Sequence, residues 1–581
     1  MGTHGVVAKM FTRGVTSACR HGHQRSRKMA TSSKILMGAQ TSPSARTDED
    51  KYVVESLIPK VPLSGMDVTQ RVLGHVHKYG HKTAIECGIT GRSYTYNQLI
   101  DATYRWGAAL ERLTGGQKTT VAIYSPNTPE YPIISFGVTA VGYIGTSINA
   151  AYTPEEVTNQ LLDSGATVLV VDPILEPFAQ MAVAATGRNI KMVVNGPSQS
   201  GCPNLQELIN DTTAPFAKQT QPSPESIAVL PYSSGTTGNP KGVALSHSAV
   251  SGSMEIFHNS QTVHLKPADG DHQDILIGLL PFFHIYGMCC VMGAGLYNGA
   301  KIITLPCFDP ELYVDTLKSH RPTVLHTVPS LVKFIAASPL ITSAELESVH
   351  TVMCGAAPVP PTAASVLKQK TSNPIFFQEG FGMTETLCTH MTPLGGERLG
   401  SSGILMPHIR AKVIDLNTGE ALPPDVPGEL CIQSPTNMTR YHGNEKATLE
   451  TIDEDGWLHT GDVATYGEDG YFSIVDRIKE LIKVKGLQVS PSELEELLLQ
   501  HPAVLDVGII GVEDDRAGEV PRAYVVAKDK VSAEELHAFL NPRIAKHKQL
   551  LGGIQFIDEL PKNPTGKIMK KELKVMANEQ S

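Results

Sequence analysis

The sequence predicts an α/β protein, with a large N-terminal domain of mainly parallel sheets followed by a small α+β domain. From about Tyr52 onward, apolar strand-like runs alternate with helical patterns, as in chains that build parallel sheets. These runs are continuous in Val, Ile and Leu, which is typical of strands buried on both faces. The pattern changes near Arg477, and 581 residues are too many for one hydrophobic core.

The large domain shows its alternation most clearly in its first half. An apolar run is followed by a turn at Pro126 and Asn127 and then by a helical stretch. Later apolar runs each follow a helical segment, as in repeated strand–helix–strand units. The predicted strands are residues 121–124, 167–171 and 191–194, and the predicted helices include residues 133–140 and 155–162.

Residues 275–300 contain no Asp, Glu, Lys or Arg, so this stretch could be taken for a membrane span. Pro281, His284, Asn298 and several glycines interrupt it. The stretch therefore predicts a buried strand, a loop and a helix, and no transmembrane segment is expected.

The residues after Arg477 predict a small domain with its own helices. Ser490 and Glu493 have the spacing of a capping box, and so do Ser532 and Glu535. Apolar side chains then lie on one helical face, at Leu494, Leu497 and Leu498. The predicted organisation is an N-terminal segment at residues 1–47, a large domain at 48–478 and a small domain at 479–581.

Residues 1–47 contain no acidic residue but many basic and hydroxyl side chains, which is typical of a mitochondrial transit peptide. The alternatives are a disordered tail or a start at Met29 or Met37, and then a cytoplasmic protein. No apolar core of a secretory signal is present, and the C-terminus is not the Ser-Lys-Leu peroxisomal signal.

Composition excludes several classes of protein. The net charge of −9 argues against nucleic acid as a partner, and a site for a polyanion must gather basic residues locally. The nine cysteines are scattered without a C-x-x-C pair. We therefore expect reduced buried thiols, and neither a disulfide framework nor a zinc site.

The loop SSGTTGNPKG, from Ser233 to Gly242, lies between two apolar runs. Its glycines and hydroxyls leave backbone N–H groups free to bind phosphate oxygens, and Lys241 adds a positive charge. The P-loop pattern of NTPases fails here, because Asn239 and Pro240 follow Gly238. The alternative is a plain surface turn.

This loop closely resembles the phosphate loop of the adenylate-forming superfamily, which includes acyl-CoA synthetases, 4-coumarate–CoA ligases, beetle luciferases and peptide-synthetase adenylation domains. The resemblance extends from about Val53 to Lys571. It implies that the loop contacts the β- and γ-phosphates of ATP through Ser233, Ser234, Gly235, Thr236, Thr237, Gly238 and Lys241.

A second motif, Gly380-Phe381-Gly382-Met383-Thr384-Glu385, resembles the G-[YF]-G-x-T-E motif of the same superfamily. The resemblance implies that Phe381 stacks on adenine, Thr384 contacts phosphate and Glu385 binds Mg²⁺. A carboxylate suits this ion, because Mg²⁺ prefers oxygen ligands. The nucleotide site is also expected to include Glu379, where many relatives carry Gln, together with Gly380, Gly382 and Met383.

Two further segments complete the expected nucleotide site. Gly355, Ala356 and Ala357 form a small-residue turn that, by resemblance, packs against adenine. Asp462, in Thr-Gly-Asp, resembles the superfamily's ribose-binding acid, and Arg477 is expected to reach ribose or phosphate. Without the resemblance, these are a strand-to-loop connection, an acidic turn residue and a surface ion pair.

His284 lies among aromatic residues in the segment PFFHIYG. A lone histidine in an apolar run is usually a satisfied core residue. The resemblance to acyl-CoA ligases and luciferases instead implies an acyl pocket. Peptide-synthetase domains typically carry Asp here to hold the amino group of their substrate. His284 therefore favours a carboxylic acid with an uncharged tail over an amino acid. The expected pocket residues are His284, Tyr286, Gly355, Gly380 and Met383.

Lysines near the domain boundary and the C-terminus complete the predicted machinery. By themselves, residues 477–486 have the pattern of a solvated edge of the protein. The resemblance implies instead that Lys479 is the hinge about which the small domain turns. It also implies that Lys483 serves thioester formation and that Lys483, Lys485 and Gly486 bind coenzyme A. Lys567, in a Pro/Gly turn, resembles the catalytic lysine that binds the carboxylate and the α-phosphate.

The sequence therefore predicts an ATP-dependent acid–CoA ligase that uses Mg²⁺ and forms an acyl-adenylate and then a thioester. A preorganised ammonium suits this reaction, because the attack brings two anions together. The predicted acid is a fatty or aryl-propenoic acid. The alternatives are a luciferase-like oxygenase, a free-standing amino-acid adenylation enzyme and a non-catalytic nucleotide-binding scaffold, and the oligomeric state stays open.

Overall fold

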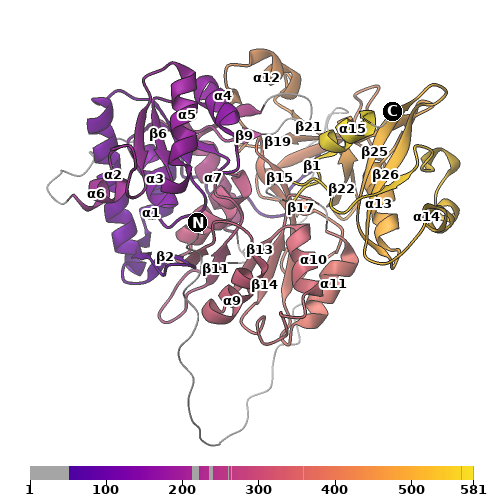
Figure 1. Ribbon diagram of the computed structural model, residues 1–581, viewed down its shortest axis with the longest axis horizontal. Coiled ribbons are helices and arrows are strands. Elements are labelled where there is room, and N and C mark those ends of the chain that lie inside the picture. Colours follow the sequence, from indigo (N-terminus) through magenta and orange to yellow (C-terminus); the bar gives the residue numbers. More distant parts are fainter. Residues whose placement is uncertain are drawn as a thin grey trace, which may run out of the picture. The chain divides into compact units, whose positions relative to one another are not determined.

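The computed structural model describes residues 51–211, 222–233, 240–259, 261–262, 265–357, 359–563 and 566–579. The predicted transit segment at residues 1–47 and the phosphate-loop residues Ser234–Asn239 lie outside the described residues. Two large sheets and one small sheet form the framework, and helices cover them (Figure 1). The predicted fold class is confirmed.

The first large sheet contains the strand–helix alternation that the sequence predicts. Its central strands β7, β6, β4, β5 and β8 are parallel, and β10 and β20 extend it with antiparallel pairing. Its elements are β4 (Thr120–Tyr124), α3 (Tyr131–Ala140), β5 (Ile144–Ile148), α4 (Pro154–Ser164), β6 (Val168–Val171), α5 (Glu176–Thr186), β7 (Lys191–Val194), β8 (Ile227–Val229), β9 (Tyr232–Ser233), β10 (Lys241–Ser246) and β20 (Arg440–Tyr441).

The second large sheet has fourteen strands, in two parts of different character. One part is parallel and is made of β2 (Thr83–Cys87), β12 (Lys301–Thr304), β11 (Ile275–Gly278), β13 (Val324–Thr327), β14 (Thr351–Cys354) and β15 (Phe376–Met383), with β3 (Ser93–Thr95) antiparallel at its edge. The other part is antiparallel and is made of β16 (Leu387–Met391), β17 (Gly403–Leu405), β22 (Tyr471–Arg477), β21 (Leu458–Tyr466), β19 (Gly428–Gln433), β18 (Arg410–Ile414) and β1 (Val54–Glu55).

The helices of this region connect the strands and cover the sheets. They are α1 (Val68–Leu73), α2 (Tyr96–Thr114), α6 (Leu205–Asn210), α7 (His247–Phe257), α8 (Ala294–Tyr297), α9 (Pro310–His320), α10 (Pro329–Ala337), α11 (Pro361–Lys370) and α12 (Glu445–Thr451). The uncharged stretch forms β11, a loop, a π-helix over Tyr286–Gly293 and α8, as predicted, and no described helix is long and apolar enough to cross a membrane.

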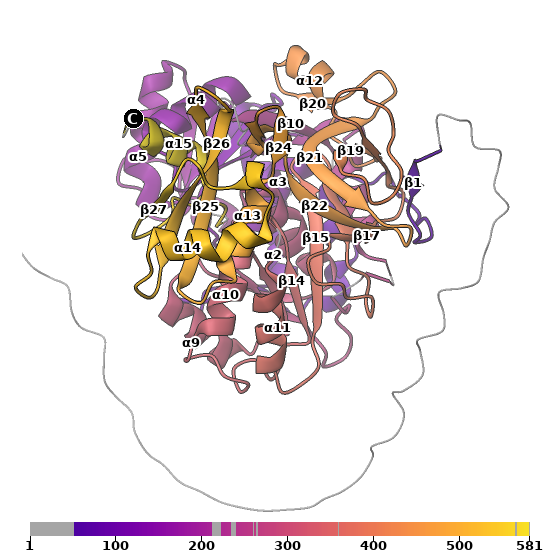
Figure 2. The same cartoon turned by 90° about the vertical axis from the view of Figure 1, so that its right-hand side faces the viewer.

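The residues after the short helix Ile478–Glu480 form a separate sheet with a separate core (Figure 2). Its strands are β23 (Ile482–Val484), β24 (Leu487–Val489), β25 (Val504–Asp514), β26 (Gly518–Ala527) and β27 (Ile554–Phe556), and its helices are α13 (Pro491–Leu499), α14 (Ala533–Leu540) and α15 (Lys570–Asn578). Alternate residues of β25 and β26 pack on α13 and α14 or on α15, so helices cover both faces.

One of the two predicted capping boxes is complete. At α14 the Ser532 hydroxyl and the Glu535 carboxylate each accept a backbone N–H of the other residue. At α13 the Ser490 hydroxyl accepts the Glu493 N–H, but the Glu493 carboxylate instead accepts two hydrogen bonds from Lys548. A nearby ammonium competes for this side chain, so the prediction for α13 is wrong in its second half.

The close approach of α2 and α3 depends on a glycine inside a helix. A methyl group added at Gly137 would lie 2.4 Å from Trp106 Cδ1 and 2.8 Å from the Thr103 carbonyl oxygen. At Gly252, inside α7, the nearest atoms would lie 3.9 Å away. The two positions share a helical backbone and differ in the space around them.

We expect Gly137→Ala to destabilise the protein by about 1–3 kcal/mol, because the added methyl group overpacks the α2–α3 contact. Gly252→Ala should leave stability unchanged or raise it by up to about 1 kcal/mol, since alanine favours a helix over glycine. Chemical denaturation followed by circular dichroism measures both variants. Equal midpoints for the two variants would contradict the packing argument.

Candidate active site

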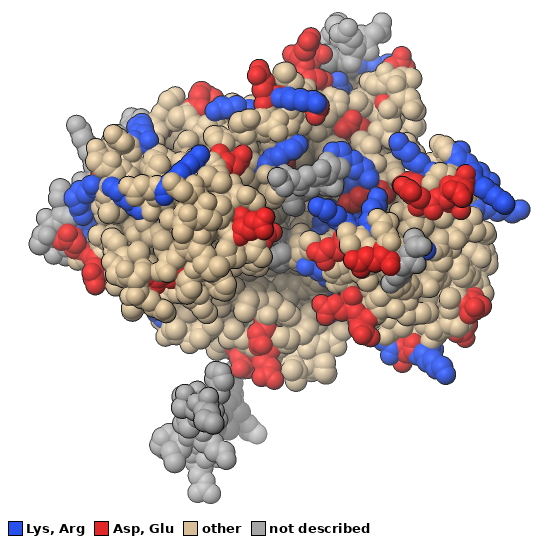
Figure 3. Space-filling view, turned by 45° about the horizontal axis from the view of Figure 1, so that its top comes forward, with Lys and Arg blue, Asp and Glu red and all other residues tan. Residues whose placement is uncertain are grey.

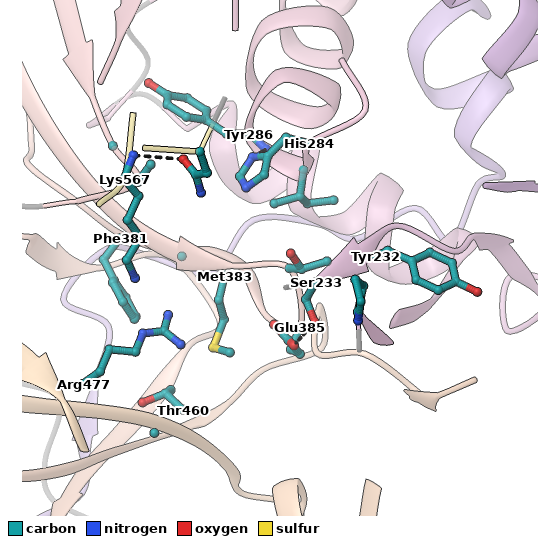
Figure 4. Close-up of a pocket in the computed structure, with 18 of the residues that line it drawn as sticks. Tyr232, Ser233, His284, Tyr286, Phe381, Met383, Glu385, Thr460, Arg477 and Lys567 are labelled. Atoms are coloured by element: carbon teal, nitrogen blue, oxygen red, sulfur yellow. Dashed lines mark hydrogen bonds between the residues drawn. The ribbon is translucent and has the colours of Figure 1, made fainter. Parts of the chain in front are cut away.

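A cavity of about 1210 Å³ lies where the two large sheets and the small sheet meet, and segments far apart in the sequence line it. Figure 4 shows several of its side chains directed toward one another from different strands and helices. It contains the following predicted site residues: Ser233, Lys241, His284, Tyr286, Gly355, Ala356, Gly380, Phe381, Gly382, Met383, Thr384, Glu385, Arg477, Lys479 and Lys567.

The ends of the predicted phosphate loop lie at one side of this cavity. β9 and β10 pair in antiparallel fashion, with Ser233 opposite Lys241, so both residues enter the cavity wall from adjacent strands. The Lys241 ammonium lies 4.7 Å from the centre of the Tyr441 ring. The strand pair confirms the predicted loop between two strands, although Ser234, Gly235, Thr236, Thr237 and Gly238 lie outside the described residues.

Glu385 is a buried carboxylate in the same wall. Its Oε1 accepts hydrogen bonds from the Ser233 hydroxyl and from the Tyr441 hydroxyl, each at 2.9 Å. Its backbone oxygen accepts the Met438 N–H at 2.7 Å, which fixes the residue after β15. Both of these side-chain hydrogen bonds are accepted by Oε1. A carboxylate such as Glu385 suits Mg²⁺, because this ion prefers oxygen ligands.

Phe381 and Gly382 form the part of the wall where adenine is expected. β15 pairs with β16 through an irregular register at these two residues. A methyl group at Gly382 would lie 2.1 Å from the Leu387 carbonyl oxygen, so only glycine fits there. The Phe381 ring meets the His390 ring edge-on at 5.5 Å, which fixes its plane.

Glu379 does not line the cavity, contrary to the expectation for the nucleotide site. Its carboxylate is buried and accepts the Gly400 N–H at 2.8 Å, and burial raises its pKa to about 7. Ala357 also does not line the cavity, whereas Gly355 and Ala356 do. Side chains alternate along a strand, so Gly380 and Glu379 face different surroundings.

Asp462 pairs with Arg477 directly across β21 and β22, and their side chains form an ion pair of 2.8 Å. The second carboxylate oxygen of Asp462 is buried and has no hydrogen-bond partner among the described residues. Burial raises the pKa of Asp462 to about 6, although Arg477 and Lys567 oppose this shift. The cavity wall here consists of Thr460, Gly461 and Arg477, so Asp462 lies behind its surface.

Lys567 enters the cavity from a turn before α15. Its backbone N–H donates to Asn563 Oδ1 at 2.9 Å, and Gly566 adopts a positive φ of 79° that closes the turn. Burial lowers the pKa of Lys567 most, followed by repulsion from Arg477, whereas Glu480 and Asp462 raise it. A desolvated ammonium thus faces the same space as Glu385 and His284.

Contacts between the small sheet and the large domain set the position of Lys567. Asp476, in β22, accepts hydrogen bonds from the Ser490 hydroxyl at 2.6 Å and from the Ser492 N–H at 3.0 Å, at the start of α13. An anion is favourable there, because the first N–H groups of a helix lack partners. On α10, Lys333 lies 3.6 Å from Asp506 of β25.

The residues predicted to bind coenzyme A lie outside this cavity. Lys479 is in the short helix Ile478–Glu480 and lines it, but Lys483, Lys485 and Gly486 do not. Lys483 is an exposed residue of β23, and Lys485 and Gly486 form the positive-φ turn before β24. Their predicted role therefore stays a prediction.

Basic side chains gather around the cavity although the chain is acidic overall. Figure 3 shows Lys and Arg on both sides of the hollow between the large and small parts. Such a field favours a polyanionic ligand, as expected from the composition. The basic residues of the lining are Lys241, Arg477, Lys479, Lys562, Lys567, Lys570, Lys571 and Lys574.

The opposite wall is apolar and contains residues that the sequence did not single out. Tyr286 donates to the Met353 carbonyl oxygen at 3.2 Å, and Gly355 lies against its ring. Met254 and Phe257 of α7 join this wall with Cys289, Cys290 and Cys388. Cys289 and Cys290 belong to the uncharged stretch, but no pattern in the sequence predicted that they lie beside α7 and β16.

His284 supplies a polar atom to this apolar wall. Its Nδ1 accepts the Tyr286 N–H at 3.2 Å, so the proton of the neutral ring lies on Nε2. Burial lowers the pKa of His284 to about 4. The wall therefore offers one neutral N–H donor.

The chain is similar to known families and proteins over nearly its whole length. Residues 74–442 match the family model described as AMP-binding enzyme, and residues 493–567 match the AMP-binding enzyme C-terminal domain. The probable 4-coumarate–CoA ligase 3 of Dictyostelium discoideum is 33% identical over 90% of this chain and 97% of its own length. The 4-coumarate–CoA ligase 3 of rice, Oryza sativa subsp. japonica, is 34% identical over 90% of this chain and 95% of its own length.

Solved structures share the fold. ATP-bound MatB from Rhodopseudomonas palustris superposes with a TM-score of 0.79 at 27% identity, covering 88% of this chain and 98% of that protein. The anthranilate–CoA ligase AuaEII, in complex with anthranoyl-AMP, superposes with a TM-score of 0.80 at 24% identity over 90% of this chain and 98% of that protein. The second likeness concerns the fold alone.

We expect the His284 ring to stay neutral, with its proton on Nε2, from about pH 5 to pH 8, because burial disfavours its charged form. NMR spectroscopy of ¹⁵N-histidine-labelled protein measures this, and His284→Gln identifies the signal. His81, an exposed histidine, provides a comparison. A midpoint near 6.5 for His284 would contradict the expectation.

Proposed function

The chain belongs to the AMP-binding enzyme family of the adenylate-forming superfamily and is an acid–CoA ligase, and we propose that it activates a carboxylate whose tail is uncharged and apolar. ATP and coenzyme A are the substrates of this class of enzyme. The observation that carries the proposal is the cavity itself, in which the half-buried Lys567 lies between a basic region and an apolar wall.

In the first step, a carboxylate oxygen attacks the α-phosphorus of ATP, and pyrophosphate leaves. Lys567 stabilises this step, because the two reacting anions repel each other and charge develops in the transition state. Arg477 and Lys241, which line the cavity, attract the nucleotide, and Asp462 holds Arg477 in place from behind the wall through their ion pair. Phe381 holds adenine against the small residues Gly355 and Ala356.

Mg²⁺ fits beside Glu385. The carboxylate is held in place by Ser233 and Tyr441 through one oxygen only, and it lies in the cavity wall. When bound, Mg²⁺ screens the phosphate charges during the displacement. Thr384, the preceding residue, is in position to donate to a phosphate oxygen from the same wall.

In the second step, the thiol of coenzyme A attacks the acyl carbon, and AMP leaves. We propose that the small domain rotates about Lys479 between the steps. The present arrangement has Lys567 inside the cavity and Lys483, Lys485 and Gly486 outside, which suits adenylate formation. Rotation would exchange the two sets and keep water from the reactive anhydride.

The apolar wall supports a fatty or aryl-propenoic acid as substrate. Met254, Phe257 and Tyr286 offer no charge to the acyl group, and the neutral His284 offers one N–H donor. A second carboxylate or an amino group would be buried there without a charged partner, which is costly.

We expect Lys567→Ala to lower pyrophosphate exchange into ATP by about 10²–10³-fold, because one preorganised charge is lost from the transition state. Thioester formation from supplied acyl-adenylate should be unchanged, because Lys567 acts before this step. The exchange assay measures the first step, and thiol consumption measures the second.

Lys530→Ala is the matched control, since Lys530 is an exposed lysine of the small domain that does not line the cavity. It should retain both activities. Equal loss of both steps in Lys567→Ala would refute the division of labour between the steps.

A panel of acids tests the substrate class. We expect cinnamic-type and medium-chain fatty acids to give pyrophosphate release at least about tenfold faster than dicarboxylic acids or amino acids, since burying an unpaired charge costs more than 1.4 kcal/mol. Coupled detection of pyrophosphate measures the rates. If a dicarboxylic acid were the best substrate, the proposed substrate class would be wrong, but the assignment as an acid–CoA ligase would stand.

A further inference from the structure

Glu429, Cys431 and His459 bring together a carboxylate, a thiol and an imidazole beside the cavity. Their ligand atoms all lie within 4.8 Å of one another. His459 Nδ1 lies 3.1 Å from Glu429 Oε2 and 3.6 Å from Cys431 Sγ. None of these residues has a role in the proposed ligase reaction.

The strand register explains why these three side chains meet. Glu429 and Cys431 are two residues apart on β19, so their side chains lie on the same face of the sheet. His459 on β21 is directly opposite Cys431 in the antiparallel pair. The register shifts between Glu429 and Cys431, which brings the carboxylate toward the imidazole.

The remaining ring nitrogen of His459 also has a suitable partner. His459 Nε2 lies 3.5 Å from Asp453 Oδ2. A carboxylate at this position is typical of histidines that bind a metal ion, because it fixes the ring and the nitrogen that faces the metal. Asp453 comes from the segment before β21 and is thus independent of the β19–β21 register.

We propose that Glu429, Cys431 and His459 form a Zn²⁺-binding site, with Asp453 orienting the histidine. Tetrahedral zinc with bonds of about 2.0–2.3 Å holds nitrogen and oxygen ligands about 3.3 Å apart, and nitrogen and sulfur ligands about 3.6 Å apart. The distances of 3.1 and 3.6 Å match these values. A thiolate and an imidazole select Zn²⁺ over Mg²⁺, so this site is distinct from the one at Glu385.

The site is accessible from the cavity and is connected to its wall. Glu429 and His459 line the cavity, whereas Cys431 is fully buried behind them. The other oxygen of Glu429 accepts the Gly461 N–H at 3.2 Å, in β21 and next to Thr460, which Figure 4 shows in the cavity wall. Water completes the tetrahedron, and the Cys431 thiol proton is released on binding.

Cobalt and zinc titrations test the proposal on full-length protein stripped of metal by a chelator. Co²⁺ should give a thiolate charge-transfer band in the near ultraviolet, and Zn²⁺ should abolish it at one equivalent. Millimolar Mg²⁺ should leave the band unchanged. Cys431→Ser and His459→Gln should each lose this band and one equivalent of bound Zn²⁺.

Two further variants separate metal binding from folding and from stray thiols. Asp453→Asn keeps all three ligands and should weaken Zn²⁺ binding by about 10–100-fold. Cys307→Ser removes an exposed thiol and should bind like the parent protein. An unchanged band in Cys431→Ser, or no band in the parent protein, would overturn the proposal, and unchanged affinity in Asp453→Asn would refute the orienting role.

Discussion

The small domain contacts the large domain through the Asp476 carboxylate, and the position of Lys567 depends on this contact. Asp476 ends a strand of the large sheet but accepts two hydrogen bonds at the first turn of α13. The helix start favours the negative charge, and the carboxylate fixes where the small sheet lies. This contact is polar, which suits the rotation of the small domain that we propose between the two steps.

The cavity has to satisfy two opposite requirements. A nucleoside triphosphate needs positive charge and groups that bind its oxygen atoms. The uncharged tail of the proposed acid needs an apolar wall instead. The chain separates the two by strand and helix: β10 and the small domain supply lysines, and α7 and the π-helix supply apolar side chains. Lys567 lines the same cavity, which suits its proposed role at the point where the two ligands react.

The strand pair β19–β21 serves two purposes at once. Thr460 and Gly461 of β21 lie in the cavity wall, and the irregular register gathers Glu429, Cys431 and His459 a few residues away. The Glu429 carboxylate contacts both groups, through Gly461 and through His459.

The sequence by itself determined the strand–helix alternation, the split character of the chain and the segments that build the cavity, because these depend on local patterns and short motifs. Only the tertiary structure decided that Glu379 lies outside the cavity and that Lys483 is exposed while the half-buried Lys567 lines the cavity, since strand alternation and domain docking set these positions. The Glu429–Cys431–His459 cluster was equally hidden. His459 is about thirty residues away from Glu429 and Cys431 in the chain, and only the register of β19 against β21 places the three together.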